Sequence, residues 1–554
     1  MSGSAEAKKQ SAGWGVVLLL AAAQFVMVLD STVMNVSISQ VVADLNTTVV
    51  GIQTAITAYT LVMAALMLAG AKLGDLWGSR RAFTLGLIIY GAGSLTTALS
   101  PNLPTLLFGW SFLEGLGAVL VIPAIAALVA STYQGHMRAL AFGIMGGVAG
   151  AAAAAGPIIG GWVTTYLSWR IVFASEVVIM LVILAFVRVL KRTEPRGGKL
   201  DMGGAVLSAL GLGLVVFGIL QSSHWGWIEP KAGVPVISGV TVAPLGLSPV
   251  IWLVAIGGFL LTMFVKLEHR IGDAGGEPLL DMRLFQIRQL RSGLSTLMAQ
   301  QFITMGTFFV IPLYLQTVLG LSAFKTGVAL LPLSIALLVC ALGGSALSGR
   351  FSPKRIVSIG LLLMLASELL LQGTIGPTLG DKFYLSLGLL GAGLGLLASQ
   401  LSNVNLSSVD PSRGGEVGGL QGTAQNLGAS LGTALVGSIL IASLATSFNT
   451  NIQANADLPT DVKTAIAQGT SKGLSFITVE AAGKLLDGKV PAAQQQQILS
   501  DYSNSQIWAL RKSIAVVAIV VMLAFLLTGG LPKSPMSAGD AKTGPSANAP
   551  PSRA

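Results

Sequence analysis

The chain has 554 residues, of which 53% are hydrophobic and only 10% are charged. A typical soluble domain carries about 25% charged residues, so a chain of this composition could not cover itself in water. The formal charge of +10 lies mostly in short clusters between apolar runs. Cytoplasmic loops of membrane proteins carry such clusters, which argues against a nucleic-acid-binding protein.

Long apolar runs follow one another along the chain and predict membrane-spanning helices. Residues 14–34 hold a single acid, Asp30, and residues 203–220 hold no charge, so each run can cross a hydrocarbon layer that needs ~20 residues. Apolar runs between polar breaks give fourteen predicted spans. They cover residues 14–38, 49–71, 82–100, 104–130, 139–163, 170–190, 203–221, 247–268, 292–316, 325–348, 355–376, 383–407, 416–446 and 513–530. The predicted fold class is an all-α membrane protein with about fourteen transmembrane helices, in two six-helix bundles with two inserted central helices.

Basic residues decide the predicted orientation, because most of them fall in alternate loops, and such loops lie in the cytoplasm. They are Lys72, Arg80, Arg81, Arg138, Arg188, Lys191, Arg192, Arg196, Lys199, Lys266, Arg270, Arg283, Arg288, Arg291, Arg350, Lys354, Arg355 and Arg413. We therefore expect a multi-pass protein of the cell (inner or plasma) membrane with both termini cytoplasmic. This topology places the polar residues 447–512 outside, where their length predicts a cap, a surface for an extracytoplasmic partner or a disordered loop.

A faint internal repeat suggests two related halves. Residues 70–81 can be set without gaps on residues 344–355, matching Gly70, Leu73 and Arg81. Repeated halves suit a transporter whose substrate site forms between them near the midplane. The predicted division is a cytoplasmic N-terminal tail at 1–13, an N-terminal six-helix bundle at 14–190, a linker with two inserted transmembrane helices at 191–290, a C-terminal six-helix bundle at 291–530 that includes the extracytoplasmic loop 447–512, and a cytoplasmic C-terminal tail at 531–554.

Three motifs resemble those of one transporter family. The segment Gly70 to Arg81 resembles the cytoplasmic signature between the second and third helices of the major facilitator superfamily. Residues 29–36 look like the first-helix motif of its fourteen-span drug:proton antiporter branch, and residues 156–161 look like the antiporter motif of the fifth helix. The signature's key positions are Gly74, Asp75, Gly78, Arg80 and Arg81, and those of the antiporter motif are Gly156, Pro157, Gly160 and Gly161.

The resemblance implies a proton-coupled exporter that works by alternating access, with residues 70–81 as a conformational latch. Its implied partners are a small-molecule substrate, protons and the lipid bilayer, with no nucleic acid, no metal and no cofactor beyond the proton gradient, and it implies a monomer. The sequence departs from the family pattern where Ser111 and Gln425 replace arginines and Glu176 replaces an asparagine.

Two acids lie well inside predicted spans. A lone ionised carboxylate at membrane depth costs at least ~2.5 kcal/mol, so we expect Asp30 to face a watery cavity or to carry a proton. Glu114, one turn from Ser111, has no cation near it in the sequence and should prefer to be protonated. Protons and a cationic substrate could compete for these carboxyl groups, which would couple the two fluxes. The alternative is that each acid only serves the structure, by hydrogen bonding or packing between helices.

Four weaker candidates for coupling or substrate binding complete the predicted site. Glu176 follows Arg170 by six residues, so an ion pair or an interfacial position explains it as well. Glu368 has no obvious partner in the sequence, and a packing role explains it as well. Gln300 and Gln301 offer uncharged donors and acceptors to a substrate, although hydrogen bonds between helices would also account for them.

Other classes of protein fit less well. The histidines, His136, His224 and His269, lie far apart in the sequence at span ends or in loops, and no pair has the spacing of metal ligands. The single cysteine, Cys340, rules out an intramolecular disulfide and a Cys-rich metal site. No phosphate-binding loop is present, so we expect neither an enzyme nor an ATP-driven pump. The open alternatives are a non-coupled facilitator and a membrane sensor or lipid-handling protein, and a lipophilic cation is the expected substrate.

Overall fold

The computed structural model describes residues 3–535 except 134, 193–199, 231–232, 238–239, 349, 410–412, 457, 471–473 and 488–489. The described part is almost entirely helical, as the composition predicts. Its first half contains α1 (Gly3–Asp44), α2 (Val49–Trp77), α3 (Ser79–Ala98), α4 (Leu103–Leu106), the π-helix η1 (Leu107–Glu114), α5 (Gly115–Thr132), α6 (Gly135–Tyr166), α7 (Trp169–Phe186) and the short 3₁₀ turn η2 (Val187–Val189).

The remaining elements form an inserted pair of helices and a second half. The inserted part contains α8 (Met202–Trp225), the paired strands β1 (Val236–Ile237) and β2 (Val240–Thr241), η3 (Pro244–Gly246), α9 (Pro249–Asp273) and η4 (Met282–Gln286). The second half contains α10 (Arg288–Leu313), the π-helix η5 (Tyr314–Val318), α11 (Ala323–Ala329), α12 (Leu331–Leu347), α13 (Pro353–Thr374), α14 (Asp381–Leu406), α15 (Gly414–Ala454), α16 (Thr460–Thr470), α17 (Val479–Leu486), α18 (Ala492–Leu527) and η7 (Thr528–Gly530).

Side-chain caps explain where several of these helices begin. Thr48 accepts a hydrogen bond from the backbone N–H of Gly51 at the start of α2, and Asn102 does the same for Thr105 at the start of α4. Asp201 caps α8 in this way. These side chains satisfy backbone donors that a helix leaves open at its N-terminus, so the chain turns at these residues and each apolar run starts anew.

Every one of the fourteen predicted spans is occupied by helix, but the count of fourteen crossings is not confirmed. Within the described residues, 12 helices are long and apolar enough to cross a membrane, or up to 13 if the bent pair α11 and α12 is one span. α3 has 20 residues but is not among them. The first turn of α3 contains Arg80 and Arg81, which precede the predicted span 82–100 and make the helix as a whole less apolar than that span.

The helices pack in a pattern that occurs twice. α1 packs on α6 and α7, and α10 packs on α15 and α18; likewise α3 packs on α5 and α7, and α13 packs on α14 and α18. Two further contacts join the halves, since α2 packs on α15 while α6 packs on α11 and α12. This correspondence is what two structurally related halves produce. The exact domain boundaries stay predictions.

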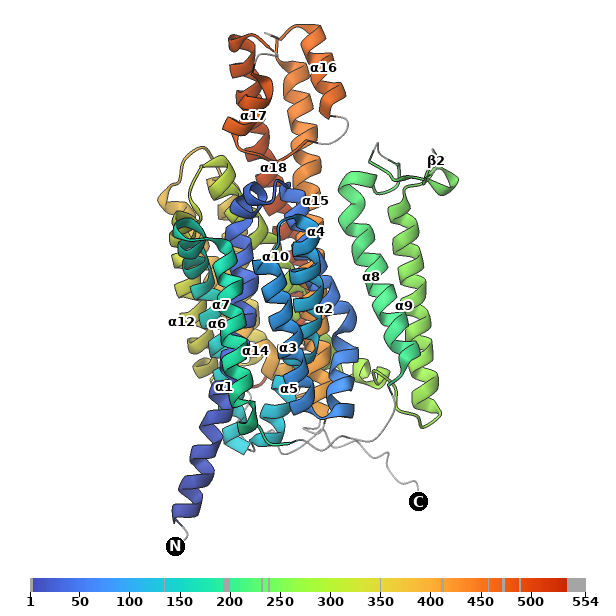
Figure 1. Cartoon of the computed structure of the whole chain (residues 1–554), viewed down its shortest axis with the longest axis vertical. Coiled ribbons are helices and arrows are strands. Elements are labelled where there is room, and N and C mark those ends of the chain that lie inside the picture. The colour runs from blue at the N-terminus through green and yellow to red at the C-terminus, as the bar shows by residue number, and fades with distance from the viewer. Residues whose placement is uncertain are drawn as a thin grey trace.

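The inserted helices stand at one side of the bundle. α8 packs on α9 and also contacts α2 and α15, the helices that join the two halves there (Figure 1). α9 is the outer member of the pair, and only 17% of the residues in its apolar 18-residue stretch are buried. Its exposed side chains include Ile256, Phe259 and Met263. An apolar face of this kind suits contact with lipid.

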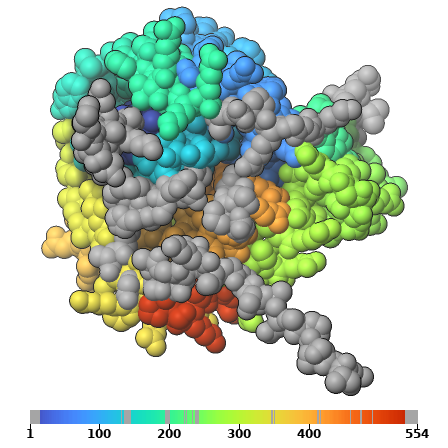
Figure 2. Space-filling view, turned by 90° about the horizontal axis from the view of Figure 1, so that it is seen from below, coloured from blue at the N-terminus to red at the C-terminus, as the bar shows by residue number. Residues whose placement is uncertain are grey.

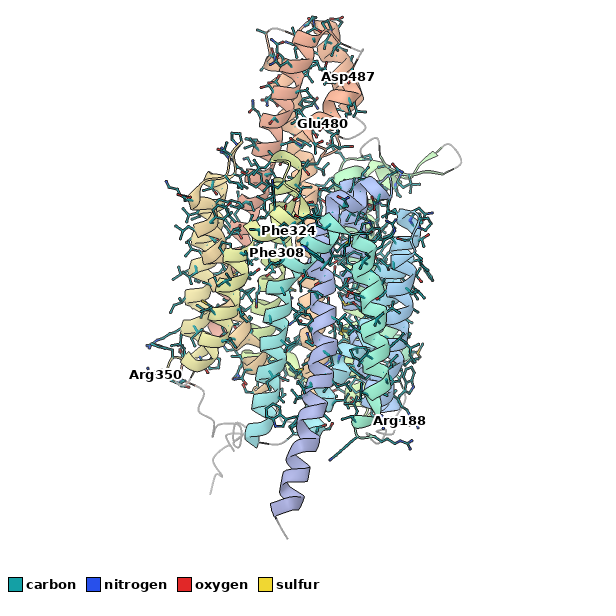
Figure 3. All side chains as sticks on the ribbon, turned by 60° about the vertical axis from the view of Figure 1, so that its left-hand side comes forward. Arg188, Phe308, Phe324, Arg350, Glu480 and Asp487 are labelled. Carbon is teal, nitrogen blue, oxygen red and sulfur yellow. The ribbon has the colours of Figure 1, made fainter. Side chains whose placement is uncertain are left out.

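A helical cap projects from the upper end of the bundle, where α15 and α18 extend beyond the other helices and carry α16 and α17 (Figure 1). The labelled acids Glu480 and Asp487 lie in this cap (Figure 3). Tyr502 of α18 ties the cap together, because its hydroxyl donates to the carbonyl of Ser475 at 2.7 Å and accepts from the N–H of Ile477 at 3.0 Å. The described part of residues 447–512 therefore forms a helical cap, and its role as a surface for a partner stays a prediction.

Two basic side chains mark the opposite end of the bundle. Arg188 and Arg350 lie there (Figure 3), and the end of α18 reaches the same face (Figure 2). α1 also begins at this end (Figure 1). These positions agree with the alternation of loops that the sequence predicts, while the side of the membrane on which this end lies stays a prediction. Part of the predicted linker, residues 193–199, and residues 536–554 of the predicted C-terminal tail lie outside the described residues.

Candidate functional site

Three buried carboxyl groups meet inside the first half of the protein. Asp30 comes from α1, Glu114 from the last position of η1 and Glu176 from α7. Each offers one oxygen atom, and these atoms all lie within 4.8 Å of one another. Asp30 and Glu114 are 0% exposed and Glu176 is 1% exposed. We call these three residues the acid cluster.

Aromatic side chains hold Asp30 in place. The indole N–H of Trp110 donates to both carboxylate oxygens of Asp30, at 3.1 Å to Oδ1 and 3.0 Å to Oδ2. Trp110 in turn stacks on Tyr59 of α2, with ring centroids 5.0 Å apart and planes 4° from parallel. The hydrogen bonds from Trp110 and the stacked ring of Tyr59 fix the orientation of the Asp30 carboxyl group.

The two glutamates have one hydroxyl donor each, and both donors come from α3. The hydroxyl of Thr97 donates to Glu114 Oε1 at 3.2 Å, and the hydroxyl of Ser94 donates to Glu176 Oε2 at 3.1 Å. Glu114 Oε2 and Glu176 Oε1 have no hydrogen-bond partner within the described part of the chain. The cluster is therefore only partly satisfied by the protein around it, which is costly for buried polar atoms.

The local backbone explains why Glu114 reaches the cluster. Residues 107–114 form a π-helix, a rare form of helix that is often found at functional sites. Gly93 of α3 lies directly against this segment, since a Cβ atom there would come within 2.6 Å of Glu114 Cγ. Ser111, which stands where the family has an arginine, donates to the carbonyl of Ala55 at 2.8 Å.

Arg170 does not pair with Glu176, so the interpretation of Glu176 as an ion-pair partner of Arg170 is wrong, while an interfacial position of Glu176 stays a prediction. The guanidinium of Arg170 instead donates to Asp44 at 2.9 Å and to the carbonyl of Ser100 at 3.0 Å. Arg170 lies at the start of α7, whereas Glu176 is nearly two turns further along and points inward. Among the residues that the structure describes, no Lys, Arg or His forms an ion pair with the acid cluster.

The other predicted coupling and substrate residues lie apart from the acid cluster, in the second half. Glu368 of α13 is fully buried and accepts a hydrogen bond at 2.9 Å from Thr307 of α10. Gln300 and Gln301 lie on α10; Gln300 is buried and Gln301 is partly buried. The structure thus brings together Asp30, Glu114 and Glu176 and leaves the other three apart from them.

The glycines of residues 156–161 allow three helices to approach closely. A Cβ atom at Gly156 would collide with Thr32 of α1, and one at Gly160 would come within 2.7 Å of Val33. On the other side, a Cβ atom at Gly161 would lie 2.5 Å from the carbonyl oxygen of Ala323 in α11. This segment of α6 therefore joins the first half to the second.

The predicted latch is not a loop. α2 continues to Trp77, α3 begins at Ser79, and Gly78 alone separates them with φ of 87°. That conformation is open to glycine and rare for other residues, which explains the glycine at this position. Arg80 is partly exposed and Arg81 is exposed, and neither forms an ion pair within the described residues. The latch role stays a prediction.

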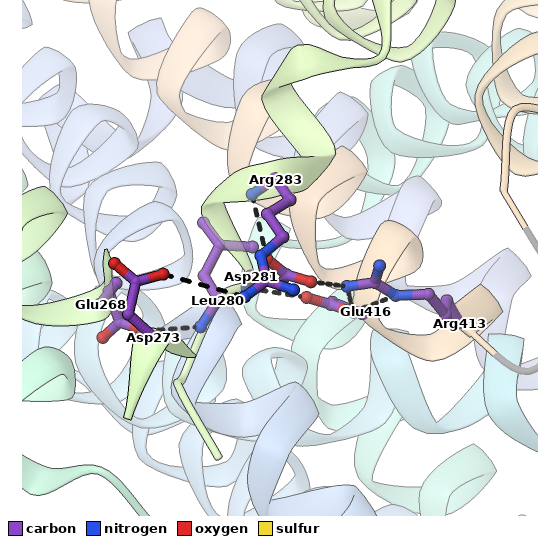
Figure 4. A network of polar contacts seen from close by, with 7 residues as sticks. All are labelled: Glu268, Asp273, Leu280, Asp281, Arg283, Arg413 and Glu416. Atoms are coloured by element: carbon purple, nitrogen blue, oxygen red, sulfur yellow. Dashed lines mark hydrogen bonds and ion pairs between the residues drawn. The ribbon is translucent and has the colours of Figure 1, made fainter. Parts of the chain in front are cut away.

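A second polar network fastens the segment between α9 and α10, which ends the predicted linker, to the start of α15 (Figure 4). Arg413 donates to Asp281 at 2.8 Å and to Glu416 at 2.9 Å, and Glu416 accepts the backbone N–H of Asp281 at 2.9 Å. Burial raises the pKa of Asp281, but hydrogen bonds from the Arg283 N–H and from Arg413 more than offset it and lower that pKa overall. We call Asp281, Arg413 and Glu416 the linker network.

Contacts beside the linker network continue it toward α2 and α9. Lys72 of α2 pairs with Glu277 at 3.3 Å, and Glu268 of α9 accepts the backbone N–H of Leu280 at 2.9 Å (Figure 4). Leu280 and Leu284 pack in a small apolar core with Val417 of α15. The segment between α9 and α10 therefore contacts the first half, the inserted pair of helices and the second half.

Several residues around the acid cluster were not predicted from the sequence. They are Tyr59, Tyr90, Ser94, Thr97 and Trp110. A tryptophan or tyrosine in an apolar run usually belongs to the core, so these residue types carry little signal by themselves. One signal was present, because Ser94 and Thr97 are three residues apart and so share a face of a helix, and Trp110 precedes Glu114 by four residues.

A bundle of membrane-length helices with acids buried in its interior is the architecture of a polytopic membrane transporter. Comparison with known proteins makes the class specific. The family model of the Major Facilitator Superfamily matches residues 20–433. The chain belongs to the Major Facilitator Superfamily, and its family and relatives identify it as a transporter rather than an enzyme.

Its relatives include named resistance and export proteins. The chain is 31% identical to the puromycin resistance protein pur8 of Streptomyces alboniger, over 73% of this chain and 76% of that protein. It is 29% identical to the tetracenomycin C resistance and export protein of Streptomyces glaucescens, over 74% of this chain and 72% of that one. With the multidrug resistance protein Stp of Mycobacterium tuberculosis it shares 25% identity over 72% and 70%.

Solved structures agree on the fold. A bacterial homologue of the human lysosomal transporter Spinster, in an inward-facing and unoccupied conformation, is similar with a TM-score of 0.55 at 14% identity, covering 94% of this chain and 97% of that one. The proton:xylose symporter XylE is similar with a TM-score of 0.51 at 12% identity, covering 93% and 96%. At such identities the likeness concerns the fold alone.

Proposed function

We propose that this protein is a proton-coupled exporter of small lipophilic or cationic compounds, which works by alternating access between its two halves. The single observation that carries the proposal is the acid cluster, in which three carboxyl groups are buried together without a basic partner in the described part of the chain. Carboxyl groups in such surroundings favour the neutral form, so they take up and release protons as their surroundings change.

The position of the acid cluster supports indirect coupling. Its hydrogen bonds come from α3 and η1, and the stacked Tyr59 comes from α2, so all of these contacts lie within the first half. A drug-sized substrate between the halves would not touch these fully buried oxygens. We propose that protonation instead changes how α1, α3 and α7 pack, and that this change alters the contacts of α1 and α6 with the second half.

The relatives support the export direction and the kind of substrate. Three of them are named for resistance to, or export of, puromycin, tetracenomycin C and multiple drugs. On this basis we extend export of small, drug-like compounds to this chain. The latch at residues 70–81, with Asp75 in the last turn of α2, is proposed to stabilise one conformation and to release it in the other.

Efflux of ethidium, a lipophilic cation, tests the proposal. In cells of an efflux-deficient host, expression of the wild type should speed ethidium efflux, and an uncoupler of the proton gradient should abolish the gain. Asp30→Asn should abolish it as well, because the amide cannot exchange a proton. Glu480→Gln changes an acid of the cap that is 80% exposed and should leave efflux unchanged.

Other outcomes would point to the alternatives. Efflux that persists with the uncoupler and in Asp30→Asn would contradict proton coupling and would indicate facilitated diffusion. If wild-type expression changes the movement of neither ethidium nor a panel of other toxic cations, while the protein is present in the membrane, a sensor or lipid-handling role would take the place of export.

A further inference from the structure

The acid cluster has a geometry that protons alone do not require. Its three carboxylate oxygens come from three different helical elements and converge to within 4.8 Å of one another. Three like charges this close in a water-poor interior cannot all persist without positive charge among them. The positive charge can be supplied by shared protons or by a cation.

A second observation points to a ligand at this place. Tyr90 of α3 is 0% exposed, and its hydroxyl lies close to Asp30 and Tyr59 but makes no hydrogen bond of normal geometry within the described residues. Oxygen atoms of Glu114 and Glu176 are unpartnered too. Because buried polar atoms are nearly always paired, a group that accepts several oxygen ligands at once would account for all three atoms.

We infer that Asp30, Glu114 and Glu176, with the hydroxyl of Tyr90, form a binding site for a small inorganic cation of the size of Ca²⁺ or Na⁺. Every atom of these four side chains that could bind a metal ion is an oxygen atom. Oxygen ligands select hard cations over those that prefer nitrogen or sulfur. Two oxygen atoms on opposite sides of Ca²⁺, each at about 2.4 Å, are about 4.8 Å apart, so the spacing of the cluster suits an ion of this size.

The charge of the site fits the same ions. Three carboxylates would leave one negative charge around Ca²⁺ and two around Na⁺, and bound protons can neutralise the remainder. The nearest titratable groups are the three acids themselves, Tyr59 and Tyr90, and the described residues supply no ion pair that would compete with the cation. This site goes beyond the proposed export function, and it holds whether or not the protein couples export to protons.

Equilibrium binding of radioactive calcium and, separately, of radioactive sodium to the purified full-length protein in metal-free detergent solution tests the inference. We expect saturable binding of one ion per protein. The ion that binds more tightly is the one that the site prefers. Glu176→Gln should weaken binding roughly tenfold or more, since loss of even an outer partner of a metal site costs about 10–100-fold. Tyr90→Phe removes only the hydroxyl and should weaken binding less.

The controls separate a specific site from general effects. Glu268→Gln changes another buried carboxyl, on α9, which accepts the N–H of Leu280 outside the acid cluster, and it should bind the ion as the wild type does. Unchanged circular dichroism and thermal unfolding would show that each variant is folded; if Glu176→Gln does not fold, Tyr90→Phe and Asp30→Asn provide the same test.

Binding of neither ion by the wild type at millimolar concentrations would overturn the inference and leave the cluster as a proton site. Equal binding by the wild type and the cluster variants would overturn it too. Since these measurements use no transported substrate and no gradient, they succeed or fail independently of the ethidium experiment.

Discussion

Gly93 controls how closely α3 can lie against the segment that carries Glu114. A Cβ atom at this position would come within 2.6 Å of Glu114 Cγ and 2.7 Å of the Glu114 backbone nitrogen, both closer than real Cβ atoms approach. We predict that Gly93→Ala displaces Glu114 from the acid cluster and abolishes ethidium efflux. It should also lower stability by about 1–3 kcal/mol, the usual cost of overpacking.

A neighbouring glycine on the same helix provides the matched control. A Cβ atom at Gly91 would meet only Met180 Cβ at 3.6 Å, an ordinary contact. Gly91→Ala should therefore keep efflux and should not lower the thermal unfolding temperature, because alanine favours helix more than glycine does. Equal loss of efflux in both variants would show that the close packing at Glu114 is not what matters.

The buried acids could be predicted from the sequence one at a time, but their meeting could not. Asp30 and Glu114 stand out because each interrupts a long apolar run. Glu176 has Arg170 close by in the sequence, and only the fold shows that Arg170 turns to Asp44 instead. Convergence depends on how α1, η1 and α7 pack, which no local pattern encodes.

At the scale of helices, the contact between α6 and α11 depends on two backbones that touch. A Cβ atom at Gly161 would lie 2.5 Å from the carbonyl oxygen of Ala323 and 3.1 Å from the Phe324 Cα, so backbone would have to move. We predict that Gly161→Ala separates α6 from α11 and reduces ethidium efflux at least about tenfold, an effect of ~1.4 kcal/mol on the transport barrier.

Gly146 lies on the same helix with nothing within 4 Å of an added Cβ atom. Gly146→Ala should transport as well as the wild type at equal amounts of protein in the membrane. If Gly161→Ala also transports normally, the close approach of the two helices is not part of the transport cycle.

The linker network should contribute to stability in a way that does not change near neutral pH. Because the pKa of Asp281 is lowered from its usual 3.8, its stabilising contribution is present above that value and is lost as the pH falls through the lowered pKa. We predict that Asp281→Asn lowers the stability of the detergent-purified protein by ~1 kcal/mol at about pH 5 to 8, and that the difference shrinks below about pH 4.

Thermal unfolding followed by intrinsic fluorescence at several pH values would measure this difference. Asp273→Asn is the control, since Asp273 is 76% exposed and its ion pair with Arg283 spans 3.8 Å; such surface pairs contribute about 0–1 kcal/mol. A stability difference for Asp281→Asn that grows as the pH falls would contradict the assignment of an ionised, stabilising Asp281.

Hydropathy located the helices but not their ends. The sequence predicts spans at 416–446 and 513–530, whereas α15 continues to Ala454 and α18 begins at Ala492. A hydropathy scan cannot tell a polar helix outside the membrane from a loop. It reports whether the side chains prefer water or lipid, and it carries no information on the backbone conformation. The same reason explains the latch, where polar residues continue α2 to Trp77.

For the whole molecule, the faint sequence repeat becomes a clear correspondence of packing. Arg81 matches Arg355 in the repeat, and both lie in the first turns of equivalent helices, α3 and α13. Few identities survive because many side chains can fill the same helix contacts, whereas the arrangement of helices is set by the apolar faces. The halves nevertheless differ in chemistry, since the described acid cluster lies in the first half only.

The orientation of the protein in the membrane can be measured by labelling cysteines that are introduced at its two ends. The chain has one cysteine, so Cys340→Ala provides a background without thiols. In this background, Glu480→Cys adds a thiol to the cap and Arg350→Cys adds one at the opposite end (Figure 3). Because basic loops stay in the cytoplasm, we predict that a membrane-impermeant maleimide labels Glu480→Cys on intact cells and labels Arg350→Cys only after the membrane is opened.

Both positions are exposed, so a difference in labelling reports the side of the membrane and not burial. Labelling of both thiols after the membrane is opened is the internal control for reactivity, and ethidium efflux by each variant shows that it is folded. The reverse pattern would place the cap and α16 and α17 in the cytoplasm. Protons that flow inward would still drive an exchanged substrate outward, because the gradients and not the orientation of the protein set the direction of antiport. The reverse pattern would therefore overturn the predicted topology without changing the predicted direction of export.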